Sequence, residues 1–133
     1  MIFVDTGAFV GRFLVNDQYH ETALQLWDTV ERTNEACLTS NLVLVEFITL
    51  LARRSTPSYA AEKARLIYGS ARFEILRPGP VEEAEALTVL LKYADQRVSF
   101  TDCVSFVLMQ RQNLRTAFTF DTHFRLAGFE LWS

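Results

Sequence analysis

The chain has 133 residues, of which 50% are hydrophobic, and its formal net charge at pH 7 is -3. This length and composition predict one globular domain with a real core, spanning residues 1–133. No apolar run approaches the roughly 18 residues of a membrane span, and the first residues lack the basic and apolar regions of a secretory signal, so we expect a cytoplasmic protein. The negative charge at first disfavours a nucleic-acid partner, but that argument weakens if several acids bind cations.

Strand and helix signals alternate along the chain, which predicts an α/β domain. The nearly unbroken apolar runs are typical of strands buried on both faces, as in parallel sheets covered by helices. We expect five strands, at 1–4, 36–39, 73–76, 116–120 and 129–132. Between the first three strands we expect a short helix at 8–14, a longer helix from Asn16 or Asp17, a helix reaching 53–54 and a helix from Pro57 to about Gly69. After the third strand we expect a helix from Gly79-Pro80, a helix at 100–112 and a short helix at 122–126.

Helix boundaries are marked by capping residues. Ser40 or Asn41, and later Ser99, are expected to cap helices, and Pro57 suits the first position of another helix. In the helix that follows residue 16, Tyr19 belongs to the apolar positions with near-helical spacing, so we expect it on the buried face.

Two of the expected strands run directly into an aspartate, Asp5 and Asp121. Parallel strands present their carboxyl ends at one edge of a sheet, where two carboxylates repel each other unless a cation lies between them. Asp102, in the first turn of a helix, and Glu46, about one and a half turns into another, are within reach of the same edge. Such a cluster suits phosphodiester hydrolysis, in which carboxylates hold one or two divalent ions that polarise the phosphate and activate water.

Each acid also has a local explanation. The segment 99–102 fits a capping box, in which its aspartate would only satisfy backbone donors. Glu46 shares a helix face with Arg53, so it could be a solvated glutamate. Asp5 and Asp121 both stand where a helix N-cap is expected. The functional interpretation rests on the joint occurrence of all four acids at one edge of one sheet.

Together these motifs resemble a PIN domain, of the small type typical of VapC toxins in toxin-antitoxin pairs. The matching segments are 2–6, 41–46, 99–103 and 118–124. The resemblance implies a three-layer α/β/α sandwich with a mostly parallel sheet of about five strands. It also implies a hydrolase, an endoribonuclease that cuts RNA with Mg2+ or Mn2+, and a small cognate VapB-type antitoxin and a homodimer as partners. The metal-binding and catalytic acids that it implies are Asp5, Glu46, Asp102 and Asp121.

Other residues of the motifs receive supporting roles. Thr6 and Thr119 match hydroxyl positions beside the acids, where a threonine can orient a carboxylate or a water. Candidates for contacts to substrate phosphates are Arg53, Arg54, Arg97, Arg115 and His123.

The chain has three other interpretations. A PIN-domain nuclease that acts without an antitoxin and a PIN module that binds RNA or protein without cutting both stay open. A receiver-like phosphotransfer domain also gathers acids at this edge, but it requires an acidic pair after the first strand and a lysine after the last, which this chain lacks.

Overall fold

Five parallel strands form the centre of the structure, a computed structural model that describes residues 1–133. The order across the sheet is β3-β2-β1-β4-β5, which places β1 in the middle. The strands are β1 (Ile2–Val4), β2 (Cys37–Ser40), β3 (Phe73–Leu76), β4 (Thr116–Phe118) and β5 (Glu130–Leu131). The predicted α/β fold with a mostly parallel sheet of about five strands is confirmed, and every strand pair is parallel.

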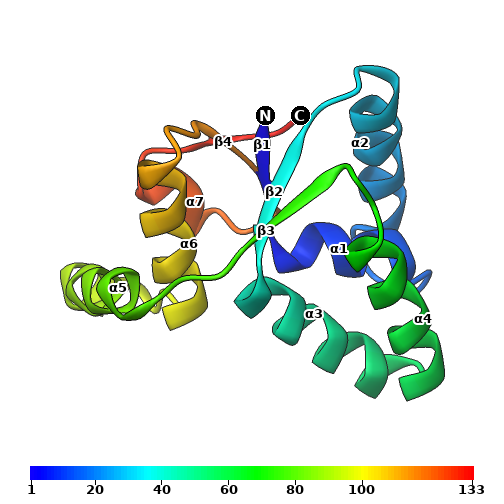
Figure 1. The fold of residues 1–133 in the computed structure, drawn as a ribbon, viewed down its shortest axis with the longest axis horizontal. Coiled ribbons are helices and arrows are strands. Elements are labelled where there is room, and N and C mark those ends of the chain that lie inside the picture. Colours follow the sequence, from blue (N-terminus) through cyan, green and yellow to red (C-terminus); the bar gives the residue numbers. More distant parts are fainter.

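Helices cover both faces of this sheet, so the fold has the three predicted layers (Figure 1). In Figure 1 the helices α1 to α4 lie on one side of the sheet and α5 to α7 on the other. The helices are α1 (Thr6–Phe13), α2 (His20–Arg32), α3 (Asn41–Arg54), α4 (Pro57–Tyr68), α5 (Pro80–Lys92), α6 (Phe100–Arg111) and α7 (His123–Leu126), with a single 3-10 turn, η1 (Ala94–Gln96). None of these helices combines the length and the apolar character that a membrane span requires.

The path of the chain creates a switch point beside β1. The chain moves outward from β1 through β2 to β3 and then returns to the opposite side of β1 to form β4. The connections on the two sides therefore lie on opposite faces, and a crevice opens between the carboxyl ends of β1 and β4. The backbone N–H of Asp5 donates to the carbonyl of Phe118 (3.0 Å), which joins the ends of these two strands at the crevice.

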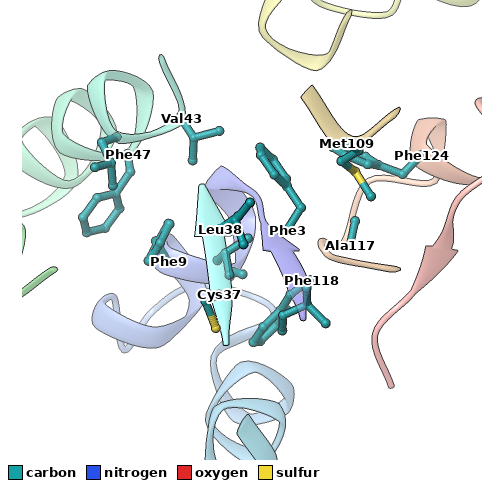
Figure 2. Packing of buried hydrophobic residues seen from close by; sticks show 14 of the residues in the cluster. Phe3, Phe9, Cys37, Leu38, Val43, Phe47, Met109, Ala117, Phe118 and Phe124 are labelled. Carbon is teal, nitrogen blue, oxygen red and sulfur yellow. The ribbon is translucent and has the colours of Figure 1, made fainter. Parts of the chain in front are cut away.

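Large aromatic side chains fill both sides of the central strands. Phe9 and Phe47 pack against each other on one face of the sheet with ring centroids 5.4 Å apart, and Phe106 and Phe124 do so on the other at 5.0 Å. Figure 2 shows Phe3 of β1 and Leu38 of β2 between Phe47 on one side and Phe124 on the other. Because β1 is buried on both faces, its three residues are all apolar, as expected for a central parallel strand.

The helix starts follow local capping chemistry. The hydroxyls of Ser40, Thr56 and Ser99 each accept a hydrogen bond from a backbone N–H of the first helical turn. Pro57 occupies the first turn of α4, where its missing N–H leaves no hydrogen bond unmade. These predicted boundaries are confirmed because each depends on groups within three residues of one another.

The start of α2 differs from the prediction. Neither Asn16 nor Asp17 caps this helix, which begins only at His20. The Asp17 carboxylate instead accepts a hydrogen bond from the N–H of Tyr19 (3.1 Å), so it closes a turn in the loop before the helix. Tyr19 therefore leaves the predicted buried face and is 39% exposed.

Candidate metal centre

The four predicted acids meet at one cavity of about 470 Å³ at the carboxyl edge of the sheet. Asp5 directly follows β1 and Asp121 lies three residues beyond the end of β4, so the two come from the strands that flank the crevice. Asp102 reaches the cavity from the first turn of α6, and Glu46 reaches it from the second turn of α3. Four different elements thus deliver one carboxylate each to the same space.

Asp5 is held by a side-chain hydrogen bond rather than by helix capping. It occupies the N-cap position of α1, but its carboxylate makes no capping hydrogen bond. The hydroxyl of Thr119 donates to Asp5 Oδ2 (2.7 Å) and so fixes the carboxylate at the cavity. Burial raises the pKa of Asp5 to about 6 despite this hydrogen bond, and the nearby charges of Glu46 and Asp121 raise it further.

Asp102 forms only half of the expected capping box. Its backbone N–H donates to the hydroxyl of Ser99 (3.1 Å), but its carboxylate returns no hydrogen bond to the Ser99 backbone. Burial, together with the charges of Asp5 and Asp121, raises the pKa of Asp102 to about 8. The carboxylate therefore faces other carboxylates, and the local explanation accounts for the backbone of Asp102 and not for its side chain.

Asp121 combines the local role with a place in the cluster. Its Oδ1 accepts a hydrogen bond from the backbone N–H of His123 (2.9 Å), so it does cap the turn that opens α7. The imidazole Nδ1 of His123 lies 2.8 Å from the same oxygen. Asp102, Asp121 and His123 each offer one ligand atom within 4.8 Å of the others, a spacing that a single metal ion could bridge.

Glu46 has the least constrained carboxylate of the four. The residue is exposed, as the local explanation supposes, and it forms neither a hydrogen bond nor an ion pair with Arg53 or any other residue. It still lines the cavity of the other three acids. A free carboxylate on a long side chain is able to move toward a cation.

Two threonines lie among the acids. The hydroxyl of Thr119 donates to Asp5 and accepts a hydrogen bond from the N–H of Asp121 (3.0 Å), so it links the two acids at the crevice. Thr6 is buried at the cavity wall, and its hydroxyl has no hydrogen-bond partner. A buried hydroxyl without a partner is uncommon in folded proteins and indicates a place for a water or a ligand.

The predicted arginines divide into three groups. Arg54 and Arg97 line the cavity, and Arg54 Nη1 also pairs with Asp17 Oδ1 at 3.2 Å. Arg53 lies in an adjoining depression that shares Glu46 with the main cavity.

Arg115 is the one predicted contact residue that the structure removes from the site. It precedes β4 and therefore lies at the amino edge of the sheet, where its carbonyl accepts from the N–H of Glu130. The three residues of β4 separate it from the carboxyl edge by about 10 Å. The structure therefore does not bring Arg115 to the cavity of the acids, because position relative to the strand, rather than charge, decides which edge a residue reaches.

The sequence patterns missed part of the cavity wall. Asp17, Gln18, Tyr19 and Phe120 also line it. The rings of Tyr19 and Phe120 are stacked, with centroids 4.3 Å apart and planes inclined by 2°. Phe120 was expected in a strand and Tyr19 in a helix, so neither pattern pointed to the cavity. The only signal was the position of Phe120 directly before Asp121.

The donor set fits a divalent cation. Carboxylate oxygens are the ligands that Mg2+ and Mn2+ prefer in proteins. Burial and the neighbouring acids raise the pKa values of Asp5 and Asp102, and the unpaired Thr6 hydroxyl leaves one polar atom free. A cation among these groups would neutralise the repulsion between the acids.

An all-parallel α/β domain with an acidic cluster at its switch point has the architecture of a metal centre for phosphodiester chemistry. The sequence model of the PIN domain family matches residues 2–130. The chain belongs to the PIN domain family, as its motifs predicted, and within that family it is similar to VapC ribonucleases.

Two relatives from Mycobacterium tuberculosis carry that assignment. The chain is 34% identical over 129 residues to the 23S rRNA-specific endonuclease VapC20, covering 97% of this chain and 95% of VapC20. It is 28% identical over 120 residues to ribonuclease VapC26, covering 90% of this chain and 86% of VapC26.

Solved structures agree with this relationship. The crystal structure of VapC20, described as a Sarcin-Ricin loop cleaving toxin, superposes with a TM-score of 0.88 at 31% identity, over 97% of this chain and 96% of VapC20. A chain of VapBC2 from Rickettsia felis, bound to a DNA fragment from its promoter, superposes with a TM-score of 0.68 at 18% identity, over the full length of both chains. At that identity the second match shows the fold alone.

Proposed function

We propose that the protein is a metal-dependent endoribonuclease that hydrolyses RNA phosphodiester bonds in the cytoplasm, and that it is the toxin of a VapBC-type toxin-antitoxin pair. The observation that carries the proposal is the convergence of four carboxylates, from four elements, on one cavity at the switch point. The 34% identity to VapC20 over nearly the whole chain supports the same activity.

The four acids Asp5, Glu46, Asp102 and Asp121 would hold the cation, Mg2+ or Mn2+. A cation held there would supply polarisation of the scissile phosphate and a lower pKa for the attacking water. Thr119 keeps the Asp5 carboxylate in a fixed orientation through its 2.7 Å hydrogen bond, which limits the motion of the acid at the centre of the sheet. The hydroxyl of Thr6 has no protein partner and is free to hold a water at the cavity wall.

The rim of the cavity supplies the positive charge that an RNA backbone requires. Arg54 and Arg97 line it, and Arg53 extends it beyond Glu46. Arginine presents a planar fork of N–H groups that matches a phosphate, so these side chains position the RNA without reading its sequence. His123, beside Asp121, faces the same cavity and is a further candidate contact.

The proposed substrate is an exposed loop of 23S ribosomal RNA, by relationship to VapC20. The proposed partners are a small VapB-type antitoxin and a second copy of the chain. Exposed apolar residues of the early helices and loops offer surface for such contacts: Val15 is 75% exposed and Leu24 is 45% exposed. Residues 1–133 form one PIN domain in this proposal.

The experiment that tests the proposal compares two aspartate variants on RNA. Purified wild type, Asp5→Asn and Asp28→Asn are incubated with 23S rRNA and Mg2+ or Mn2+. Asp28 is exposed on α2 and pairs only with Arg32, so its variant is the matched control. We expect cleavage by wild type and Asp28→Asn, loss of cleavage in Asp5→Asn with an unchanged circular dichroism spectrum, and no cleavage by any of the three in EDTA.

Three results would each defeat one part of the proposal. Full cleavage by a clean preparation of Asp5→Asn would remove the carboxylate centre from the reaction. RNA binding without cleavage by the wild type, under every divalent cation tested, would favour the non-catalytic PIN module. A nuclease without any antitoxin would cleave RNA equally but would not form a complex with the product of a neighbouring small gene.

A further inference from the structure

A pair of stacked aromatic rings forms one rim of the acidic cavity. The rings of Tyr19 and Phe120 are parallel within 2°, with centroids 4.3 Å apart. Phe120 directly precedes Asp121, and Tyr19 lies in the loop before α2. Both residues line the cavity that contains the four carboxylates. An aromatic surface therefore stands beside the place where a scissile phosphate would be held.

The inner ring of the pair is fixed by its surroundings. Phe120 packs edge-to-face on the buried Phe118, with centroids 6.2 Å apart. Gly7 is a neighbour on another side, where an added Cβ would lie 3.6 Å from the Phe120 ring, an ordinary van der Waals distance. The contact with the buried Phe118 gives Phe120 a fixed base for the ring stacked on it.

The backbone of the outer ring is also held in place, while its side chain stays accessible. The N–H of Tyr19 donates to Asp17 Oδ2 (3.1 Å), and its carbonyl accepts from the N–H of Ala23 (2.8 Å). Arg54 fixes Asp17 in turn through the ion pair at 3.2 Å. The phenol oxygen of Tyr19 makes no hydrogen bond, and 39% of the residue is exposed. Several contacts thus hold the backbone of a tyrosine whose ring lies outside the hydrophobic core.

We propose that Tyr19 is a stacking platform for an unpaired nucleobase of the RNA, adjacent to the scissile phosphate. The proposal rests on the ribonuclease function proposed above and specifies the substrate. A base inside a duplex has both faces covered by its neighbours, whereas a base in a loop or single strand offers a free face to an aromatic ring. Arg54, which is tied to the same loop through Asp17, would contact the backbone phosphate of that nucleotide.

This arrangement makes the protein selective for exposed bases at the cut. The carboxylates handle the phosphate, which is the same in every nucleotide, and Tyr19 requires that a neighbouring base be unstacked. Stacking on an aromatic ring is tolerant of base identity, so Tyr19 selects for single-stranded geometry and not for a particular sequence.

The test pairs protein variants with RNA that lacks bases. Wild type, Tyr19→Phe and Tyr19→Leu are titrated, in EDTA so that no cleavage occurs, against a fluorescein-labelled 12-nucleotide RNA of mixed sequence and an abasic oligomer of the same length. We expect Tyr19→Phe to bind the RNA within twofold of wild type, and Tyr19→Leu to bind it about tenfold more weakly. The three proteins should bind the abasic oligomer with equal affinity, because it has no base for the ring to contact. Comparing the protein variants on both oligomers therefore isolates the contact between ring and base.

Three outcomes would overturn the proposal. One is equal binding of the RNA by wild type and Tyr19→Leu, the result expected if Tyr19 serves a protein partner instead. Another is an equal loss on RNA and abasic oligomer, which would indicate a collapsed loop or a pure charge effect. The third is no preference of the wild type for RNA over the abasic oligomer. Thermal unfolding of each variant identifies any loss of fold.

A cleavage measurement separates this proposal from the proposed function. With Mg2+ or Mn2+ present, Tyr19→Leu should raise KM about tenfold and leave kcat within about threefold, because the platform positions substrate and takes no part in bond breaking. If the wild type cuts no RNA at all, the nuclease proposal fails. If it cuts RNA and Tyr19→Leu shows an unchanged KM, only the stacking proposal fails.

Discussion

The stability of the metal-free protein should increase when the central carboxylate is neutralised. Asp5→Asn keeps the shape of the side chain, and the amide oxygen of asparagine can still accept the hydrogen bond from Thr119. What the substitution removes is a buried negative charge that faces Asp102, Asp121 and Glu46. Substitutions at a buried hydrogen-bonded position are usually destabilising, so a gain in stability would be a specific consequence of the unpaired charge.

The magnitude and sign follow from the pKa of Asp5. Burial raises this pKa from 3.8 to about 6, so between these values the folded protein retains a proton that the unfolded chain releases. Stability therefore falls as the pH rises through this window, and above pH 6 the loss at Asp5 reaches about 3 kcal/mol. The pKa of Asp102 is raised in the same direction, to about 8, and extends the fall toward that pH.

Urea denaturation in EDTA at several pH values between 4.5 and 8.5 measures this effect. We expect the free energy of unfolding of the wild type to decrease across the range and that of Asp5→Asn to decrease less. At pH 7.5 the variant should be the more stable protein by up to about 3 kcal/mol, or about 10 °C in Tm. Mg2+ or Mn2+ should reverse the order, because a ligand that binds only the folded wild type stabilises that protein alone.

Two results would refute this reasoning. A wild type whose stability in EDTA is constant or rises between pH 5 and 8 would mean that the acids are compensated without metal. An Asp5→Asn variant that is less stable than the wild type at pH 7.5 would mean that the ionised carboxylate contributes more through its hydrogen bond with Thr119 than it loses through burial and repulsion.

Three further predictions concern the link between the acids, the arginines and the core. Thr119→Val should lower kcat about 10- to 100-fold in cleavage assays, because it frees the Asp5 carboxylate, and Thr119→Ser should restore most of the rate; equal rates would contradict the role of the hydroxyl. Arg97→Ala should weaken RNA binding and reduce the slope of log K against log salt by about 1, whereas Arg115→Ala should change neither; a loss in both variants would remove the distinction between the two sheet edges. Phe9→Ala, in the aromatic core, should lower the free energy of unfolding by about 3 to 5 kcal/mol in urea, and a loss below 1 kcal/mol would contradict the packing described.

Local chemistry made the helix starts at Ser40, Thr56 and Ser99 predictable, because cap and N–H lie within one turn. Asp17 shows where this approach fails. Its carboxylate could have capped a helix or closed a turn, and both choices use hydrogen bonds to nearby N–H groups. In the structure the other carboxylate oxygen of Asp17 pairs with Arg54, a residue 37 positions away. The turn at Asp17 therefore forms together with a tertiary contact. No local pattern contains that information.

The acids of the candidate centre that directly follow strands were predictable from the sequence. Asp5 and Asp121 end strands, and a residue at the end of a parallel strand reaches the carboxyl edge whatever the strand order is. Asp102 and Glu46 lie on helices, where each alone was explained as well by a local role, and they were selected by joint occurrence at one sheet edge and by the family resemblance. Arg115 was misplaced because its charge was considered without its position at the start of β4, and Tyr19 was missed because its spacing alone suggested a helix face.

The position of β1 has a consequence for partial unfolding. Strands at the two edges of a sheet open more readily than the strand between them, because they have a neighbour on one side only. Asp5 follows the central strand and Thr119 follows its neighbour β4, whereas β3 and β5 form the edges. Fraying of either edge strand should therefore leave the hydrogen bond between Asp5 and Thr119 intact, and in hydrogen exchange the amides of β1 should be among the last to exchange.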